Sequence, residues 1–422
     1  MLLILFGISR CNTTEPPPDE KAITLKLEDV SCTEAWITLN SNIKLPATIE
    51  LKQNSQVVKT INLNKSDSLL YIDSLLPNTS YQYQVSSNKH QVSSNSLNIT
   101  TMDTTSHNFT WQTWTFGEHS SSVLRDVAII NENNIWAVGE IYMNDSLGQP
   151  DPHAYNAAHW DGSEWKLYRV MFYAGCTNPT VMVPYPASSI IVFNENDIWI
   201  TMYGDQVARL SGITQVETHC MPVSFSINKI WGTSSSDLYV VGTGGTIIRY
   251  NGTLWARMGS GTEVDIQDIW GITNTNNEVE FILCAASNAI EPGEHKILRI
   301  NNVNRIDTLS WISNRRVHSV WMDTKFQLFA CGDGMFISSN SVIWKQQELT
   351  PVFKTRIRGK SKNDLFVVGG FGLLAHYNGV RWQEYPEAAS ALVYTSLDIE
   401  NNLMVTVGYT QTQAVIQMFT RN

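Results

Sequence analysis

Short apolar runs separated by turn residues recur along most of this chain. In the segment from Ile227 to Trp255, INKIWGTSSSDLYVVGTGGTIIRYNGTLW, a Ser-rich turn and a Gly-Gly turn separate three runs of strand length. Asn-Gly then leads into a fourth run at Trp255. Near copies of this segment cover residues 317–344 and 356–382. The pattern predicts a repeated unit of four short antiparallel strands in about 40 residues.

The repeat predicts a ring of such units, because one unit cannot bury both faces of its own sheet. The second strands end at Gly139, Met202, Gly242, Ala285, Gly332, Gly369 and Gly408. These seven positions predict a seven-bladed β-propeller over residues 107–422. The run FTWQTWTF around Trp111 has no partner nearby, whereas the C-terminal end supplies only three strands. We therefore expect this N-terminal strand to complete the last blade and close the ring, which leaves no sheet edge exposed.

A different pattern precedes the repeat. Seven short alternating strands in residues 22–103 predict a β-sandwich, so the whole chain is expected to be all-β. The segment LPNTSY, which ends at Tyr81 and is followed by alternating Tyr83 and Val85, resembles the tyrosine corner of fibronectin type III domains. Trp36 falls where the core tryptophan of strand B sits in those domains. The resemblance implies a spacer or adhesion module.

The first residues predict export. The apolar run from Leu2 to Ile8 is too short to span a bilayer, which favours the core of a signal in residues 1–11. Cys11, followed by a Pro-rich acidic linker in residues 12–21, resembles a bacterial lipoprotein signal in which Cys11 carries the lipid. Arg10 and the lack of a basic start depart from that pattern, and an ordinary tail with an incidental cysteine is the alternative. The resemblance implies a lipid-anchored protein at the bacterial cell surface or in the periplasm, with no other membrane attachment.

Composition and cysteine spacing exclude several function classes. A net charge of −10 and a pI near 5.4 leave no basic footprint for nucleic acid. The six cysteines show no CxxC spacing and no His partners at zinc distance, so no metal site or cofactor is predicted. Cys176 and Cys220 fall in the fourth-to-first connections of neighbouring blades, and they are candidates for a disulfide.

Two turn motifs recur in fixed places. Asn-Glu-Asn-Asp before Ile198 has counterparts before other second strands, which favours turns in which Asn and Asp bond their own backbone over a metal loop. DGSEW, ending at Trp165, and NGTLW, ending at Trp255, resemble degenerate Asp-box turns of sialidase-type propellers. That resemblance implies a structural role, with the tryptophan packed between blades.

Candidate ligand-binding residues come from two places. Insertions at residues 142–156, 170–187 and 288–295 fall on one rim of the predicted ring, where propellers usually bind. These loops offer Tyr142, Asp151, His153, Tyr155, Tyr173 and Tyr185, whereas the first strands near the channel offer Arg125, His318 and Arg356, with Asp126, Gln267 and Asp268 beside them. The alternatives are that the loops pack on themselves and that the channel residues only solvate a water-filled tunnel.

The whole chain resembles bacterial surface lipoproteins with a fibronectin type III stalk and a Trp-rich propeller. The resemblance implies a monomeric, non-enzymatic binding or adhesion protein that engages a glycan or an extracellular protein through one propeller face. No GxSxG, HExxH, P-loop or dinucleotide fingerprint is present. A carbohydrate-active hydrolase or lyase using channel carboxylates is the alternative from another class. A structural subunit of an envelope assembly is a third.

Overall fold

The computed structural model describes residues 22–422 except 178, 289–292, 302–304, 313 and 389–390. The predicted signal and linker, with Cys11, lie outside the described residues. The chain divides into two compact units, Met1–Met102 and Asp103–Asn422. Among the described residues no helix is long and apolar enough to cross a membrane. Nearly all regular elements are strands, so the prediction of an all-β protein is confirmed.

The first unit packs two antiparallel sheets over one core. One sheet has the order β1 (Ile23–Val30), β2 (Ala35–Ser41), β5 (Asp67–Ile72). The other has the order β4 (Gln56–Leu63), β3 (Ala47–Gln53), β6 (Ser80–Ser87), β7 (Val92–Ser93), with β8 (Leu97–Thr100) also paired to β6. Alternating residues such as Ile37, Leu39, Ile49 and Tyr83 point into the core. This period of two explains why the sequence of these strands alternates between apolar and polar residues.

Two predicted features of this unit have different outcomes. The backbone N–H of Leu76 donates to the hydroxyl of Tyr81 at 2.9 Å, which is the contact that a tyrosine corner requires. Trp36 is fully buried but is not part of the core cluster between the two sheets. Its neighbours Ala35 and Ile37 belong to the core cluster, so alternation places Trp36 on the opposite face of β2. There its ring lies 5.8 Å from that of Tyr71.

The described part of the second unit contains seven four-stranded antiparallel sheets. The first three are β10 (Val123–Asn131), β11 (Asn134–Ile141), β12 (Tyr155–Trp160), β13 (Trp165–Tyr168); β16 (Ala187–Asn194), β17 (Asp197–Met202), β18 (Gln206–Ser211), β19 (Thr214–Cys220); and β20 (Ile227–Ser234), β21 (Asp237–Gly242), β22 (Ile247–Tyr250), β23 (Trp255–Met258). The next three are β24 (Ile266–Thr273), β25 (Val279–Ser287), β26 (His295–Asn301), β27 (Ile306–Leu309); β28 (Val317–Thr324), β29 (Gln327–Gly332), β30 (Met335–Ser338), β31 (Lys345–Gln347); and β32 (Lys354–Ser361), β33 (Asp364–Gly369), β34 (Leu374–Tyr377), β35 (Trp382–Glu384). The last is β36 (Val393–Glu400), β37 (Leu403–Tyr409), β38 (Ala414–Arg421) and β9 (Phe109–Phe116). A hairpin of β14 (Phe172–Tyr173) with β15 (Met182–Val183) and two short helices, η1 (Gly370–Gly372) and η2 (Pro386–Ala388), lie in the connections.

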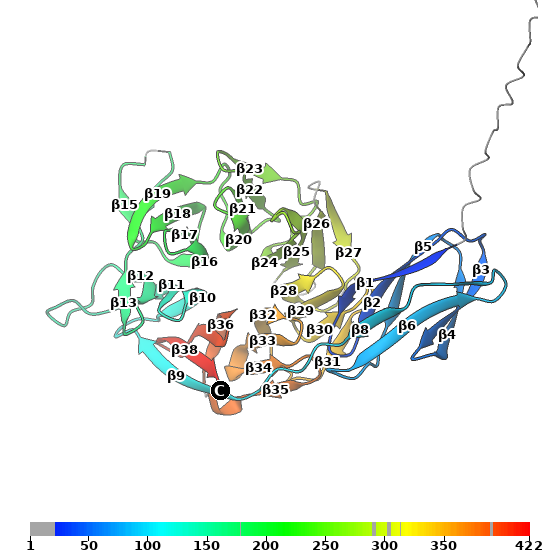
Figure 1. The fold of residues 1–422 in the computed structure, drawn as a ribbon. Coiled ribbons are helices and arrows are strands. Elements are labelled where there is room, and N and C mark those ends of the chain that lie inside the picture. The colour runs from blue at the N-terminus through cyan, green and yellow to red at the C-terminus, as the bar shows by residue number, and fades with distance from the viewer. Residues whose placement is uncertain (1–21, 178, 289–292, 302–304, 313, 389–390) are drawn as a thin grey trace, which may run out of the picture. The chain divides into compact units, whose positions relative to one another are not determined.

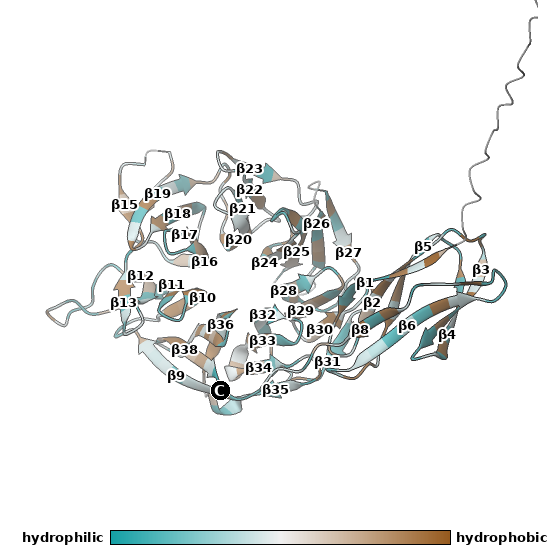
Figure 2. Ribbon diagram, in the orientation of Figure 1, coloured by the Kyte–Doolittle hydropathy of each residue, from teal (hydrophilic) through white to brown (hydrophobic). Residues whose placement is uncertain are grey.

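The seven sheets form a closed ring (Figure 1). Each first strand contacts the first strand of the next sheet, and β36 contacts β10. In the last sheet β9 pairs antiparallel with β38, from Phe116 opposite Ala414 to Phe109 opposite Arg421. The lone N-terminal strand thus joins the C-terminal strand, as the distribution of apolar runs predicts. In Figure 2 the apolar residues, drawn in brown, concentrate along the strands of each sheet. Each sheet of the ring is covered on both faces by its two neighbours, so both faces are apolar.

The predicted outer turns contribute to packing between sheets. The carboxylate of Asp161 accepts the backbone N–H groups of Ser163 and Glu164, both at 3.0 Å. The tryptophan that follows each turn reaches the preceding sheet of the ring. The ring of Trp255 lies 6.4 Å from that of Trp199, and Trp165 lies 6.3 Å from Trp114 of β9. The structural role expected for these turns agrees with these contacts.

The acidic turns before the second strands agree with the prediction for Asn and differ from it for Asp. Asn194 does accept a backbone N–H within its own turn, from Asn196 at 2.9 Å. The last Asp of the turn instead pairs with a basic residue of the third strand. Asp197 pairs with Arg209 at 2.8 Å, Asp237 with Arg249 at 2.8 Å and Asp364 with His376 at 3.0 Å. Each of these basic side chains lies against an aromatic ring of the second strand, namely Trp199, Tyr239 and Phe366. The Asp therefore ties the second strand to the third rather than capping its own turn.

Candidate functional site

Every first strand carries a bulge near its beginning. In β10, Leu124 is opposite Gly139 and Asp126 is opposite Val138, so Arg125 is an extra residue without a partner position. The same shift occurs in all seven sheets. Glycine closes most of the second strands because the bulged backbone approaches closely. A Cβ atom at Gly139 would lie 2.2 Å from the carbonyl oxygen of Val123. The repeated VVG and similar endings are therefore the sequence signature of the bulge.

The seven bulge residues are all polar and line one cavity. They are Arg125, Ser188, Asn228, Gln267, His318, Thr355 and Thr395. Tyr203, Ile227 and Arg356 complete the lining, and the cavity volume is about 210 Å³. We call this cavity the channel mouth, because one residue from each innermost strand contributes to its wall.

The residue after each bulge forms a second polar layer, which is buried. Its members are Asp126, Ser189, Lys229, Asp268, Ser319, Arg356 and Ser396. Asp126 joins four sheets: its carboxylate accepts Lys229 Nζ at 2.5 Å, Ser189 Oγ at 2.6 Å and Ser396 Oγ at 2.7 Å. The backbone N–H of Ile190 adds a fourth bond at 3.0 Å. This layer therefore links sheets across the channel as well as around it.

Asp268 is the second centre of this layer. Its carboxylate accepts Arg356 Nη1 at 2.6 Å and Arg358 Nη2 at 2.7 Å, as well as the hydroxyl of Ser319 at 2.5 Å. The guanidinium of Arg358 also lies over the ring of Trp270, 4.8 Å from its centroid. One carboxylate is thus shared by two guanidinium groups from the sixth sheet.

These contacts fix the charge of both carboxylates. Burial alone would raise the pKa of Asp126, but Lys229 and Arg356 outweigh burial and lower the pKa to about 2. Burial likewise opposes ionisation of Asp268, and Arg356 and Arg358 hold its pKa well below the usual range. Both groups are ionised at neutral pH and fully engaged in hydrogen bonds. They hold the ring together and present no free carboxylate to a ligand.

His318 has a different environment. Burial and the nearby charge of Arg356 lower its pKa to about 4, so the imidazole is neutral at physiological pH. Its ring meets Phe353 edge to face at 5.3 Å between centroids. His318 forms no hydrogen bond with any other residue that the structure describes. It is therefore a donor and acceptor available to a ligand in the channel mouth.

Three of the predicted binding residues meet in this cavity: Arg125, His318 and Arg356. Tyr142 is connected to them through Glu140. Arg125 Nη2 lies 2.5 Å from one carboxylate oxygen of Glu140, and the Tyr142 hydroxyl donates to the other at 2.9 Å. The guanidinium of Arg125 also lies 5.0 Å from the ring centroid of Tyr203. The rim of the channel mouth is thus held in place by an ion pair and by aromatic contacts.

The other predicted loop residues do not line the channel mouth. Asp151, His153 and Tyr155 surround Arg169, which pairs with Asp151 at 2.5 Å and donates to the His153 carbonyl at 2.7 Å. Its guanidinium lies 4.0 Å from the ring centroid of Tyr155. This part of the 142–156 insertion therefore packs around Arg169, the residue that follows β13, and not into the channel mouth.

The 170–187 insertion is fastened to the second sheet. Cys176 and Cys220 form a disulfide, and the side chain of Gln206 bonds both the N–H and the carbonyl of Tyr173 at 2.8 Å. Tyr185 packs against the hydrophobic core between the first two sheets. These contacts give both tyrosines a structural role. Half of the third insertion, residues 289–292, lies outside the described residues.

Sequence reasoning missed several residues of the two layers. Lys229 and Arg358 were not among the candidates, and neither were the bulge residues Ser188, Asn228, Thr355 and Thr395. An alignment of the first strands on their shared apolar residue would have found most of them. RDV, SSI, NKI, QDI, HSV, TRI and TSL each place two polar residues directly before an apolar one. Two successive polar residues in a buried strand are the local signal of the bulge.

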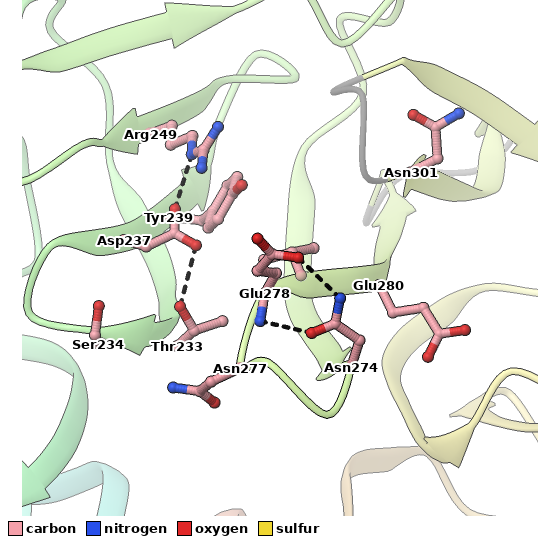
Figure 3. Close-up of a pocket in the computed structure, with 11 residues that line it drawn as sticks. Thr233, Ser234, Asp237, Tyr239, Arg249, Asn274, Asn277, Glu278, Glu280 and Asn301 are labelled. Carbon is pink, nitrogen blue, oxygen red and sulfur yellow. Dashed lines mark hydrogen bonds and ion pairs between the residues drawn. The ribbon is translucent and has the colours of Figure 1, made fainter.

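A larger pocket lies between the third and fourth sheets. Its volume is about 520 Å³, and its polar side chains are shown in Figure 3. Most of them face one another: Asp237 accepts Arg249 Nε at 2.8 Å and the Thr233 hydroxyl at 3.1 Å, and Asn274 bonds Glu278 at 3.0 Å. Because its charged groups already have partners within the pocket, we regard the channel mouth as the better candidate site.

Comparisons with known proteins support the fold. No protein-family model matches the chain, and no curated protein matches its sequence. A solved structure described as YCF48 bound to D1 peptide is similar over 74% of this chain and 95% of the other, with a TM-score of 0.53 at 14% sequence identity. The WD40 β-propeller domain of Doa1 matches with a TM-score of 0.49 at 13% identity, covering 74% and 97% of the two chains. Saccharomyces cerevisiae Sqt1 matches with a TM-score of 0.47 at 11% identity, covering 73% and 98%. At these identities the similarity shows a β-propeller fold and nothing about the ligand.

Proposed function

We propose that this protein is a surface-anchored, non-enzymatic binding protein that engages an extracellular protein or glycan through the channel mouth. One observation carries the proposal: seven bulge residues, one from each sheet, are all polar and converge on one cavity. Polar groups presented by a rigid scaffold are typical of binding sites.

The buried layer gives this site its rigidity. Because Asp126 and Asp268 tie together first strands from different sheets, the bulge residues above them are held in fixed positions. A preorganised site loses little conformational entropy when a ligand binds. The same bonds argue against the hydrolase alternative, because a glycosidase needs carboxyl groups that reach the substrate.

A protein partner is favoured over a small molecule. The cavity of about 210 Å³ is smaller than the usual range of small-molecule pockets, about 300 to 1,000 Å³. It is large enough for one side chain or one chain end of a larger ligand. The similar propeller YCF48 was solved bound to a peptide. We propose that the present propeller also binds an extended segment of a partner, with one group entering the channel mouth.

The remaining parts of the chain serve to present the propeller. We propose that Cys11 carries a lipid anchor and that residues 22–103 form a fibronectin type III-like stalk that precedes a seven-bladed propeller in the chain. The hydrogen bond from Leu76 to Tyr81 supports this assignment of the stalk. The protein would then act as a monomer on the outside of a bacterial cell or in its periplasm.

Binding assays with the full chain test the proposal. The purified protein is applied to a glycan array and to a displayed library of peptides, and affinities are measured for every ligand found. His318→Ala and Arg125→Ala should each weaken binding about tenfold or more, whereas Arg257→Ala, on an exposed outer strand, should have no effect. Ligands whose affinity is unchanged by both mouth variants would refute the proposal. Cleavage of an array glycan would favour the hydrolase instead.

A further inference from the structure

We infer that the channel mouth is a receptor for a single carboxylate group presented by the bound partner. This inference rests on the proposed function, since it identifies the chemical group with which the partner enters the cavity. It follows from the hydrogen-bond donors in the cavity, from the distribution of charge around it and from its size.

The channel mouth contains strong donors without acceptors. Arg356 is only 6% exposed, and it bonds the protein through Nη1 alone, to Asp268. Its Nε is buried and has no acceptor within the described part of the chain, and the same holds for Nε of Arg125. His318 adds an imidazole that also lacks a protein partner among the described residues. Buried donors of this kind are normally satisfied, so a ligand oxygen is the acceptor that the cavity lacks.

Three hydroxyl groups of the wall direct their protons away from the cavity. The hydroxyl of Thr355 donates to the Tyr394 carbonyl at 2.8 Å, and that of Thr395 donates to the Leu124 carbonyl at 2.6 Å. The Ser188 hydroxyl bonds the Met202 carbonyl at 2.9 Å. These hydroxyl protons are therefore used within the ring. Tyr203, Asn228 and Gln267 keep neutral donors in the wall, but the charged donors left for a ligand are guanidinium groups, which favour an anion over a neutral hydroxyl.

The charge around the cavity is also suited to an anion. Among the residues that the structure describes, no Asp or Glu lines the channel mouth. Asp268 is shared between Arg356 and Arg358, so this one negative charge faces two positive ones. The nearest carboxylate at the rim, Glu140, is already bound by Arg125 and Tyr142. The positive charge of Arg356 also reaches His318, whose protonated form it disfavours. A ligand carboxylate would supply the missing negative charge.

The size of the cavity limits the part of a ligand that can carry the carboxylate into it. A volume of about 210 Å³ corresponds to roughly seven waters, each occupying about 30 Å³ in the liquid. That space accepts a carboxylate with a short aliphatic stem, but not a peptide segment. Two sources share this chemistry: the α-carboxylate at the end of a protein chain, and the side chain of Asp or Glu within it. Either can form paired hydrogen bonds with a guanidinium group.

Small probes test the inference without a known partner. The full chain, labelled with ¹³C at its nine histidines, is titrated with N-acetylglycine, which offers an α-carboxylate, and with the α-amide of N-acetylglutamate, which offers a side-chain carboxylate. The α-amide of N-acetylglutamine is the neutral control of matched shape. His318→Gln identifies the His318 resonance. We expect at least one carboxylate to shift that resonance and to bind about tenfold or more tightly than the neutral amide, which corresponds to about 1.4 kcal/mol. The probe that binds more tightly shows whether the cavity prefers an α-carboxylate or a side-chain carboxylate.

Variants of Arg356 provide a second readout. Arg356→Gln should abolish the preference for the carboxylate, and Arg356→Lys, which keeps the charge, should restore part of it. If Arg356→Gln fails to fold, the comparison of carboxylate with amide binding to the wild type still tests the inference. Equal binding of the amide, or no shift of His318 at millimolar carboxylate, would overturn the inference.

The outcome is separable from that of the proposed function. A partner that requires the channel mouth but retains its affinity when its carboxylates are amidated would refute the carboxylate receptor and leave the proposed function intact. Binding of small carboxylates at His318, with every macromolecular ligand insensitive to His318→Ala, would support the receptor and refute the proposed function.

Discussion

Removal of the charge of Asp268 is the sharpest test of how the ring is held together. Asp268 is fully buried, and its two oxygens accept hydrogen bonds from Arg356, Arg358, Ser319 and the backbone of Val320. Asp268→Asn keeps the volume of the side chain and removes its charge. Two buried guanidinium groups then lose their shared counter-charge, and the new amide N–H₂ points a donor at other donors.

The expected loss of stability is large. Removing one partner of a buried ion pair destabilises a protein by about 3–5 kcal/mol, because the other charge stays buried without compensation. We expect the free energy of unfolding to fall by about 4 kcal/mol in Asp268→Asn. Asp307 provides a matched control, since it also bonds two arginines, Arg299 and Arg305, but at the surface. Asp307→Asn should cost less than about 1 kcal/mol.

Urea unfolding followed by tryptophan fluorescence measures both variants. All fourteen tryptophans except Trp36 lie in the second unit, so the signal reports on the ring. With a urea slope of about 3 kcal/mol/M, a loss of about 4 kcal/mol lowers the midpoint by about 1.3 M. An unchanged midpoint in Asp268→Asn, or a shift no larger than that of Asp307→Asn, would refute the structural role of this network.

The pH dependence supplies an internal check on the same variant. The folded-state pKa of Asp268 is lowered by its arginines, so its contribution is present above the unfolded pKa of about 4 and is lost as pH falls towards the folded value. The difference in stability between the wild type and Asp268→Asn should therefore be greatest near neutral pH and should shrink in acid. A difference that does not change with pH would mean that the loss comes from packing rather than charge.

Three further predictions concern the bulge and two titrating groups. Gly369→Ala should lower the free energy of unfolding by about 2 kcal/mol or more, because its Cβ would lie 2.2 Å from the Phe353 carbonyl oxygen. Gly370→Ala is the control: its Cβ would lie 3.9 Å from the same oxygen, and it should cost less than about 1 kcal/mol. Urea midpoints measure both variants. Burial raises the pKa of Asp398 to about 6, so the folded state binds the proton of this carboxyl more tightly than the unfolded state does. The wild type therefore loses stability as pH rises from about 4 to above 6. Asp398→Asn should remove this loss, which melting temperatures at pH 5 and pH 8 would show. Burial lowers the pKa of His107 to about 4, so the unfolded state binds the proton of this imidazole more tightly than the folded state does. The wild type therefore loses stability as pH falls from about 6.5 to 4. His107→Gln should reduce this loss, which urea midpoints across that range would measure.

Much of the fold could be predicted from the sequence because its signals are local. Alternating and continuous apolar runs locate the strands, and the unpaired run around Trp111 predicts its pairing with the C-terminal strand. The position of Trp36 could not be predicted in this way. A shift of one residue moves a side chain to the other face of a sheet, and the resemblance to a tyrosine corner near Tyr81 does not fix the register of β2.

The candidate site was predictable only in part. Arg125, His318 and Arg356 were identified because they lie on first strands, which a propeller places around its channel. The ion pairs beneath them were not, because their partners are distant in sequence. Asp126 and Lys229 are 103 residues apart, and no local pattern joins them. The aromatic residues of the insertions were overrated, since side chains such as Tyr155 already contact other residues of the protein, in this case Arg169.

The bulge explains how one strand can serve both stability and binding. In a regular strand Arg125 and Asp126 would point to opposite faces, and only one of them could reach the channel. The extra residue directs both towards it, so each first strand contributes one residue to the buried network and one to the channel mouth. Substitutions in the buried layer, as at Asp268, break ion pairs that join several sheets. Substitutions in the bulge layer, as at His318, change a wall that the network below already supports. The repeated glycine makes room for the bulge, so residues of the channel mouth can change while the network below them stays intact.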